Sequence, residues 1–216
     1  MPGTVPASSV PPQRPLRADA ARNRAALVRA AREVFERDGF VHARITDIAQ
    51  AAGVAHGSFY SHFQSKEEAL AAVLAEVQEE MLHPGPAASP TEGSDPVAVI
   101  EAANRAYLEA YRRNARLMAM LEQVATVDED FKRLRLERSD AFVKRNAKAV
   151  RRLQRAGLAD PDLDPDLTAL AISTMVSRTA YVAFALERVP VDFERLVATL
   201  TRLWTNALAI TTTKED

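Results

Sequence analysis

The sequence predicts an all-α protein, and two observations carry this prediction. Apolar residues recur at three- and four-residue spacing along almost the whole chain, which is the period of an amphipathic helix and not of a strand. Glycine is scarce, with only seven in 216 residues. Because 47% of the residues are hydrophobic and 26% are charged, a chain of this length can bury a substantial core.

The first third of the chain contains three predicted helices. The first covers about 20–38, and Gly39 follows it at the place where a left-handed cap favours glycine. The next two are short, at about 46–52 and 55–63, and Gly53 lies in the tight turn between them. Two short helices joined by a glycine turn are typical of a helix-turn-helix.

A fourth helix is predicted to begin at Ser65. Ser65 and Glu68 satisfy the capping-box pattern, in which two side chains accept hydrogen bonds from backbone N–H groups at the start of a helix. The apolar side of this helix consists of Leu70, Val73, Leu74, Val77 and Met81. We expect it to link the two halves of the chain.

Five more helices are expected after a loop at 83–95, where repeated proline and glycine disfavour a helix. The best-marked start is Pro165, because Asp164 can accept from unpaired N–H groups and proline is tolerated at the first helical position. These helices are predicted at about 96–113, 116–125, 128–156, 165–187 and 191–210.

Charge is segregated along the chain, although the formal net charge is only −1. Residues 1–66 carry a net charge of +4, residues 67–100 carry −7, residues 101–160 carry +5 and residues 161–216 carry −3. A basic front end followed by an acidic stretch indicates that the front end meets a polyanion. In the +5 region we expect most of the charge to lie on a solvated helix face.

Several classes of protein are disfavoured by composition. The absence of cysteine removes disulfides and thiolate metal sites, which fits a cytoplasmic protein. The proline-rich residues 1–19 lack the apolar stretch of a signal peptide and are expected to form a disordered tail. The stretch "LTALAISTMVSRTAYVAFAL" is interrupted by hydroxyl groups and Arg178, so a buried soluble helix is expected there instead of a membrane span.

No metal, cofactor or catalytic fingerprint is found in the sequence. His56 and His62 are six residues apart and do not share a helix face, and no paired carboxylate accompanies them. The seven glycines form neither a phosphate loop nor a dinucleotide fingerprint. We therefore expect no cofactor, no metal and no enzymatic activity.

The stretch "AALVRAAREVFERDGFVHARITDIAQAAGVAHGSFYSHFQSKEEALAAVLAEV", residues 25–77, resembles the TetR family of transcriptional regulators. The resemblance implies a helix-turn-helix DNA-binding domain at 20–66 and a helical effector-binding and dimerisation domain at 67–216. It further implies a homodimeric, ligand-responsive regulator, most simply a repressor released from palindromic operator DNA by a small apolar or amphipathic effector. The alternative is a helical small-molecule-binding protein, or an enzyme using Tyr107, Glu122 and Arg178, whose helix-turn-helix does not bind an operator.

The family's DNA contacts can be transferred to this chain by position. The residues implied to face base edges are Ala55, His56, Gly57 and Ser58, and those implied to hold phosphates are Thr46, Tyr60, His62 and Lys66. A small residue such as Gly57 lets the recognition helix approach the bases closely. The competing reading is that Gly57 avoids a clash with the first helix. Phe59 and Phe63 are expected in the core, and Arg14, Arg17, Arg22 and Arg24 either add phosphate or minor-groove contacts or belong to a solubilising extension.

In this family the middle C-terminal helices enclose an effector pocket and the last two pair with a second subunit. The expected lining, chosen by residue type and spacing, is Tyr107, Tyr111, Met118, Glu122, Phe142, Met175, Arg178, Tyr181 and Phe184. Glu122 and Arg178 are lone charges in apolar surroundings, so they pair with each other, cross the dimer interface or anchor an effector. The last helix carries a wide apolar surface, which either completes its own subunit or serves the dimer: Phe193, Leu196, Val197, Leu200, Leu203, Trp204 and Leu208.

Overall fold

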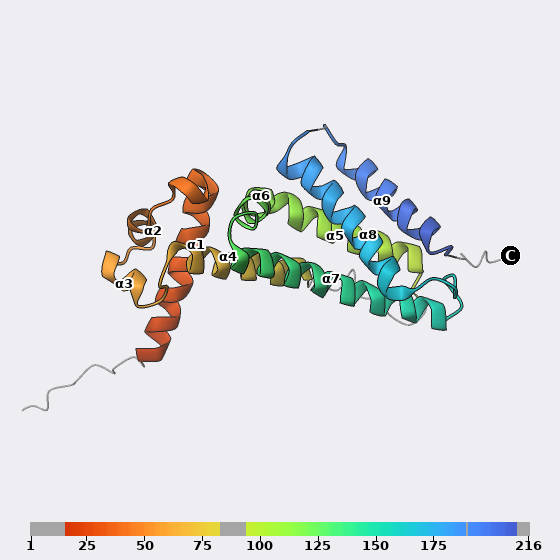
Figure 1. Cartoon of the computed structure of the whole chain (residues 1–216), viewed down its shortest axis with the longest axis horizontal. Helices are drawn as coiled ribbons and strands as arrows, with labels where there is room; N and C mark the ends of the chain where they lie inside the picture. Colours follow the sequence, from red (N-terminus) through yellow and green to blue (C-terminus); the bar gives the residue numbers. More distant parts are fainter. Residues whose placement is uncertain (1–15, 83–93, 189, 211–216) are drawn as a thin grey trace, which may run out of the picture. The chain divides into compact units, whose positions relative to one another are not determined.

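Every regular element in the computed structural model is helical, within the residues that it describes: 16–82, 94–188 and 190–210 (Figure 1). This confirms the all-α prediction. The helices are α1 (Leu16–His42), α2 (Ile45–Ala51), α3 (His56–Tyr60), α4 (Lys66–Leu82), α5 (Pro96–Arg113), α6 (Ala115–Val124), α7 (Glu129–Arg155), α8 (Pro165–Ala180), the π-helical turn η2 (Tyr181–Ala185) and α9 (Phe193–Ala207). The proline-rich start of the chain and most of the predicted loop, 83–93, lie outside the described residues.

The chain divides into two compact units, one ending at Leu70 and the other beginning at Ala71. Helix α4 contains this boundary and is one continuous helix through it.

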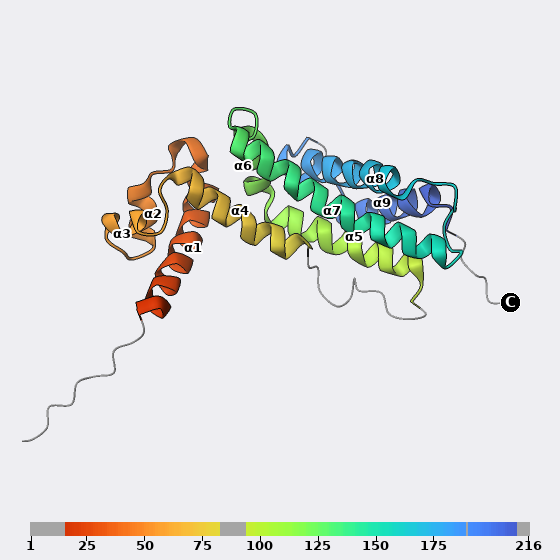
Figure 2. The ribbon, with the colours of Figure 1, turned by 60° about the horizontal axis from the view of Figure 1, so that its bottom comes forward.

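The first unit consists of α1, α2, α3 and the start of α4 (Figure 2). Helix α1 begins at Leu16, earlier than predicted, so part of the expected tail is helical. Gly39, with φ 72° and ψ 167°, interrupts it where the sequence predicted the end of the helix; this positive φ favours glycine. The core of the first unit is formed by fully buried side chains from this part of the chain: Leu27, Val34, Phe35, Ile48, Phe59, Phe63 and Leu70.

The start of α4 has the predicted capping arrangement with one difference. The Glu68 N–H donates to the Ser65 Oγ at 3.2 Å, as expected. The Glu68 carboxylate accepts from the Gln64 N–H at 2.6 Å, one residue before the capping serine. The side chains predicted for the apolar face of α4 are all buried.

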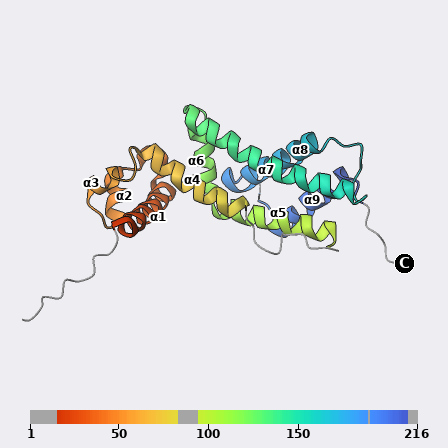
Figure 3. The same ribbon diagram turned by 90° about the horizontal axis from the view of Figure 1, so that it is seen from below.

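The second unit is built from helices α5 to α9, with the end of α4 (Figures 2 and 3). Helix α7 packs on α8, α5 packs on α9, and α6 contacts both α7 and η2. Aspartate side chains cap the N-termini of four of these helices by accepting from backbone N–H groups: Asp95, Asp128, Asp164 and Asp192.

The predicted single helix over 165–187 is instead an α-helix followed by the π-helical turn η2. The segment Pro165–Ala185 is long and apolar enough for a membrane span, a test that core helices of soluble proteins also pass, and 28% of its apolar window is buried. The expected burial is therefore only partial in the single chain, because Leu167 is 67% exposed and Leu170 is 47% exposed.

The apolar surface of α9 mainly completes its own subunit. Five of its predicted apolar residues are buried within the single chain: Leu196, Val197, Leu200, Trp204 and Leu208. Leu203 remains 46% exposed. The exposed leucines that remain available for a partner subunit are thus Leu203 on this helix and the exposed leucines of α8.

Candidate nucleic-acid interface and ligand cavity

The N-terminal end of α3 presents small and polar residues to solvent. Ala55 has an extended backbone (φ −64°, ψ 145°) and precedes the helix, and Ala55, His56 and Gly57 are all exposed. Phe59 is completely buried and anchors α3 to the core, as predicted. The three positions at this end of α3 that the resemblance assigns to base edges are therefore accessible from solvent.

Gly57 is not required by packing. A Cβ atom placed on Gly57 would have no other heavy atom within 4 Å among the residues compared. The reading in which Gly57 avoids a clash with the first helix is therefore wrong. Its backbone also lies outside the positive-φ region that would favour glycine. Neither steric nor conformational demand of the isolated protein explains this glycine, although it weakens a helix by about 1 kcal/mol relative to alanine.

The remaining positions implied to contact DNA differ in exposure. Tyr60 is 52% exposed, and its ring lies edge-on to that of His56 at 5.4 Å between centroids. Thr46 is exposed at the start of α2, whereas Ser58 and His62 are half-buried. These residues come from α2, α3 and the turn after α3, so one small segment of the fold carries them.

Lys66 differs from the others because its ammonium group serves the fold. The Lys66 Nζ donates to the carbonyl oxygen of Phe40 at 2.7 Å and to that of Ala43 at 3.3 Å. It also lies 4.5 Å from the centre of the Phe40 ring. The implied phosphate ligand thus ties the start of α4 to the segment after Gly39.

The arginines near the start of α1 are similarly engaged where the structure describes their side chains. Arg22 forms an ion pair with Asp19, and the Arg24 guanidinium lies 5.0 Å from the centre of the Phe63 ring. Both remain exposed, so neither contact removes them from solvent.

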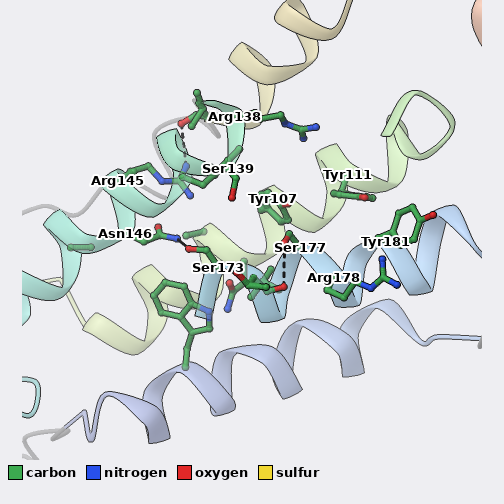
Figure 4. Close-up of a pocket in the computed structure, with 18 of the residues that line it drawn as sticks. Tyr107, Tyr111, Arg138, Ser139, Arg145, Asn146, Ser173, Ser177, Arg178 and Tyr181 are labelled. Carbon is green, nitrogen blue, oxygen red and sulfur yellow. Dashed lines mark hydrogen bonds between the residues drawn. The ribbon is translucent and has the colours of Figure 1, made fainter. Parts of the chain in front are cut away.

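The second unit contains a cavity of about 770 Å³, large enough for a drug-sized molecule (Figure 4). Seven of the nine residues predicted to line the cavity do so, and Phe184 is not among them: Tyr107, Tyr111, Met118, Glu122, Phe142, Arg178 and Tyr181. Met175 does not line it. At 100° per residue, Met175 lies on the side of α8 opposite to Ser173 and Ser177, which do.

Glu122 and Arg178 both line the cavity but have different partners in the single chain. The Glu122 carboxylate lies 3.9 Å from the guanidinium of Arg135. The Arg178 guanidinium lies 4.8 Å from the centre of the Tyr181 ring. The possibility that they pair with each other is therefore not realised.

Two cavity residues that the sequence did not single out are Arg138 and Arg145, both on α7 (Figure 4). The Arg138 guanidinium donates to the thioether sulfurs of Met118 and Met81, the latter at 2.7 Å. Arg145 donates to the Leu82 carbonyl oxygen at 3.2 Å and lies 5.1 Å from the Phe142 ring centre. Burial lowers the pKa of both guanidinium groups, although an arginine remains charged.

The spacing of these arginines contained a signal. Arg138, Phe142, Arg145, Ala149 and Arg152 follow one another at three- and four-residue intervals, so they lie along one face of α7. An aromatic and a small residue interrupt the charges on this face. A helix face that is fully exposed to solvent has no need of an aromatic residue between its charges. The expectation that most of the positive charge in this region is solvated therefore overlooked Arg138 and Arg145, which line the cavity.

Two of the cavity tyrosines, Tyr107 and Tyr111, remain neutral hydroxyls. Burial raises the pKa of Tyr107 to about 12, and burial also raises the pKa of Tyr111. Both can therefore act as hydrogen-bonding or stacking groups at neutral pH, but not as counter-ions.

Each of the two units of the chain matches a known protein family. Residues 27–73 match the family described as bacterial regulatory proteins, tetR family, and residues 100–209 match the C-terminal domain of the transcriptional regulator EthR. The regulator TtgR of Pseudomonas putida is 28% identical over 170 residues, covering 73% of this chain and 78% of its own. EthR of Mycolicibacterium smegmatis is 24% identical over 185 residues, which is 85% of either chain.

Solved structures share the fold. A TetR-family regulator from Mesorhizobium loti has a TM-score of 0.75 at 18% identity, covering 88% of this chain and 96% of its own. SmeT, the repressor of a multidrug efflux pump of Stenotrophomonas maltophilia, has a TM-score of 0.70 at 21% identity, covering 88% and 91%. With one family matching the helix-turn-helix and a second matching half of the chain, the protein belongs to the TetR family of transcriptional regulators.

Proposed function

We propose that the protein is a homodimeric repressor that binds a palindromic operator through the start of α3 and is released by a small molecule in the cavity. The observation that supports DNA contact most directly is the free space at Gly57, since a glycine without a role in folding fits a helix that must approach DNA closely. No enzymatic activity is proposed.

Two-fold symmetry supports the dimer. One recognition helix covers one half-site, and operator half-sites lie about 34–36 Å apart, so a palindrome is read by a two-fold protein. The exposed leucines of α8 and α9 provide an apolar face for the partner subunit. The relative SmeT represses an efflux pump, and repression is the mode that we propose for this protein as well.

Helix α4 is the proposed route of control. It is continuous between the helix-turn-helix and the cavity wall, to which it contributes Leu82. A ligand that shifts this end of α4 would alter the separation of the two recognition helices. Such a ligand must prefer the released state, and operator DNA must then weaken its binding by the same factor.

The decisive experiment is a search for the operator in a genomic fragment library, followed by fluorescence anisotropy titrations at several salt concentrations. We expect specific binding whose log-log dependence on salt has a slope of about −0.9 for each phosphate neutralised. Absence of specific binding across the library would refute the proposal.

Substitution of Gly57 tests the proposed interface itself. Because Gly57 is exposed and a Cβ there has no compared heavy atom within 4 Å, Gly57→Leu is expected to leave thermal stability unchanged or slightly raised. Operator affinity should fall at least about ten-fold, since a lost base contact typically costs about 1–3 kcal/mol. Ala75→Leu adds comparable bulk at an exposed position of α4 and serves as the control. Undiminished operator binding by Gly57→Leu would remove α3 from the interface.

A further inference from the structure

The wall of the cavity is strongly asymmetric in charge. Among the described residues, it contains one carboxylate, that of Glu122, and six cationic side chains: Arg135, Arg138, Arg145, Lys148, Arg152 and Arg178. The aromatic rings of Tyr107, Tyr111 and Phe142 belong to the same wall. An apolar ligand would use only the rings and leave the charges without a role.

Arg138 is the cation that most needs a partner. Thioether sulfur is a weak acceptor, and among the described residues the guanidinium of Arg138 has only the sulfurs of Met81 and Met118 as hydrogen-bond acceptors. Within the described parts of the chain, no carboxylate lies within 4.0 Å of this group. A buried charge without a counter-ion costs several kcal/mol unless another group compensates it.

Arg145 has one backbone acceptor, the Leu82 carbonyl, and a ring contact with Phe142. A guanidinium carries five N–H donors, so most of its hydrogen-bonding capacity remains free of described protein acceptors. Arg138 and Arg145 are seven residues apart on α7, which places them on the same face of the helix, two turns from each other.

The described side chains of the wall do not place a carboxylate against Arg138. Glu122 acts on Arg138 only from a longer distance, and its carboxylate lies 3.9 Å from Arg135. The buried tyrosines keep their protons at neutral pH. The indole N–H of Trp204 adds a further buried donor without an acceptor among the described residues. Donors and positive charge therefore exceed acceptors and negative charge.

We propose that the effector is an amphipathic organic anion, held by its acidic group at Arg138, with Arg145 as second donor, and by its aromatic or aliphatic body against Tyr107 and Phe142. This inference rests on the proposed role of the cavity as the effector site. It narrows the expected apolar or amphipathic effector to an anion, and it places the polar anchor at Arg138 instead of at Glu122 or Arg178.

The same two arginines contact the last turn of α4. Arg138 bonds the Met81 sulfur at 2.7 Å, and Arg145 bonds the Leu82 carbonyl at 3.2 Å. A bound carboxylate or sulfonate is a stronger acceptor than either, because both partners of the new hydrogen bond are charged. The anion thus competes with the end of α4 for its donors, which links recognition of the acid to the helix proposed to transmit control.

The test uses two fluorescent probes with the same aromatic body, anilinonaphthalene sulfonate and the uncharged N-phenylnaphthylamine. Trp204 is the only tryptophan of the chain and lines the cavity, so energy transfer from Trp204 reports binding there. In the full-length protein we expect the sulfonate to bind at least about ten-fold more tightly, the effect of one charged hydrogen bond.

Arg138→Gln and Arg145→Gln remove the positive charges singly, and we expect one or both to abolish the preference for the sulfonate while binding of the neutral probe persists. Arg133→Gln is the matched control, because Arg133 is an exposed residue of α7 that pairs with Asp130. Circular dichroism checks that the variants fold. If a variant does not fold, the comparison of the two probes in the unmodified protein still decides the charge requirement.

Equal affinities for the two probes, failure of the sulfonate to bind, or a preference that survives both substitutions would overturn the inference. No DNA is present in these titrations, so they are independent of operator binding. A protein that finds its operator but does not distinguish the probes would contradict only the anionic effector, whereas discrimination without an operator would contradict only the repressor.

Discussion

Lys66 illustrates at the scale of single residues how the fold can use a side chain that a motif assigns to DNA. Its ammonium group donates to the carbonyls of Phe40 and Ala43 and lies over the Phe40 ring. Phe40 lies in the last turn of α1, just after the interruption at Gly39, and Ala43 directly follows this helix, where carbonyl groups lack intrahelical partners. Hydrogen bonds from this lysine therefore connect the start of α4 to the end of α1 within the first unit.

Replacement of Lys66 by methionine should destabilise this unit. A hydrogen bond from a charged donor contributes about 1.5–3 kcal/mol, and the half-buried position of Lys66 suggests the lower end. Hydrogen exchange of the α1–α3 backbone amides should show a decrease of about 1–2 kcal/mol in their free energy of opening. Arg29→Met, at an exposed position of α1, is expected to change it little.

The salt dependence of operator binding by Lys66→Met separates the two roles of the lysine. If the ammonium group held a phosphate, its loss would reduce the log-log slope by about 0.9. We expect an unchanged slope at temperatures where the variant is folded. A reduced salt slope together with normal amide protection would indicate that Lys66 contacts a phosphate, and it would contradict the structural role of this lysine.

Burial of single residues was predicted correctly where helix periodicity determines it. The contacts of long charged side chains were not predicted, because these side chains can reach several different partners. Phe59 and Phe63 are in the core because their spacing fixes their face of the helix. The destination of the Lys66 amine and the contacts of Arg138 depend on tertiary neighbours distant in sequence. The flexible apolar side chain of Met175 suits a cavity wall, but its position around α8 is opposite to the cavity-lining Ser173 and Ser177.

At the scale of elements, local capping chemistry explains why the helices after residue 95 were found close to their observed ends. The sequence predicted the cap at Asp164, which accepts from N–H groups of the first turn of α8, and Asp95 and Asp128 cap α5 and α7 in the same way. The π-helical turn at Tyr181–Ala185 could not be predicted in this way, because it depends on a shifted hydrogen-bond pattern without a distinct composition.

Asp164→Ala tests this account at the start of α8. The Asp164 Oδ1 accepts from the N–H groups of Asp166 at 2.9 Å and Leu167 at 2.8 Å. Loss of such a cap costs about 1 kcal/mol, so the urea midpoint should fall without a change in the slope of the transition. Asp162→Ala removes a nearby exposed carboxylate that does not cap α8, and it should have a smaller effect. Equal losses would indicate a general charge effect.

At the scale of the whole molecule, the apolar surface that remains exposed is the feature the single chain does not account for. Leu167 and Leu170 on α8 and Leu203 on α9 are each close to half exposed or more. The sequence predicted apolar helices here. It could not predict which part of their apolar surface packs within the subunit and which part contacts a second subunit, because helix periodicity is the same in both cases. The structure assigns most of α9 to its own core, which leaves a narrower face for the proposed dimer.

The double substitution Leu170→Glu and Leu203→Glu should therefore disrupt the dimer without unfolding the subunit. Two carboxylates per subunit on a desolvated face carry a cost of several kcal/mol, whereas in the single chain both positions reach solvent. Light scattering should show a monomer at concentrations where the unmodified protein is dimeric. Val127→Glu places the same charge at a residue that is 87% exposed and outside α8 and α9, so it should remain dimeric. Operator affinity should decline together with dimerisation, because one subunit reads only one half-site. A double variant that stays dimeric would exclude this face as the interface, and the partner would have to be sought on another surface.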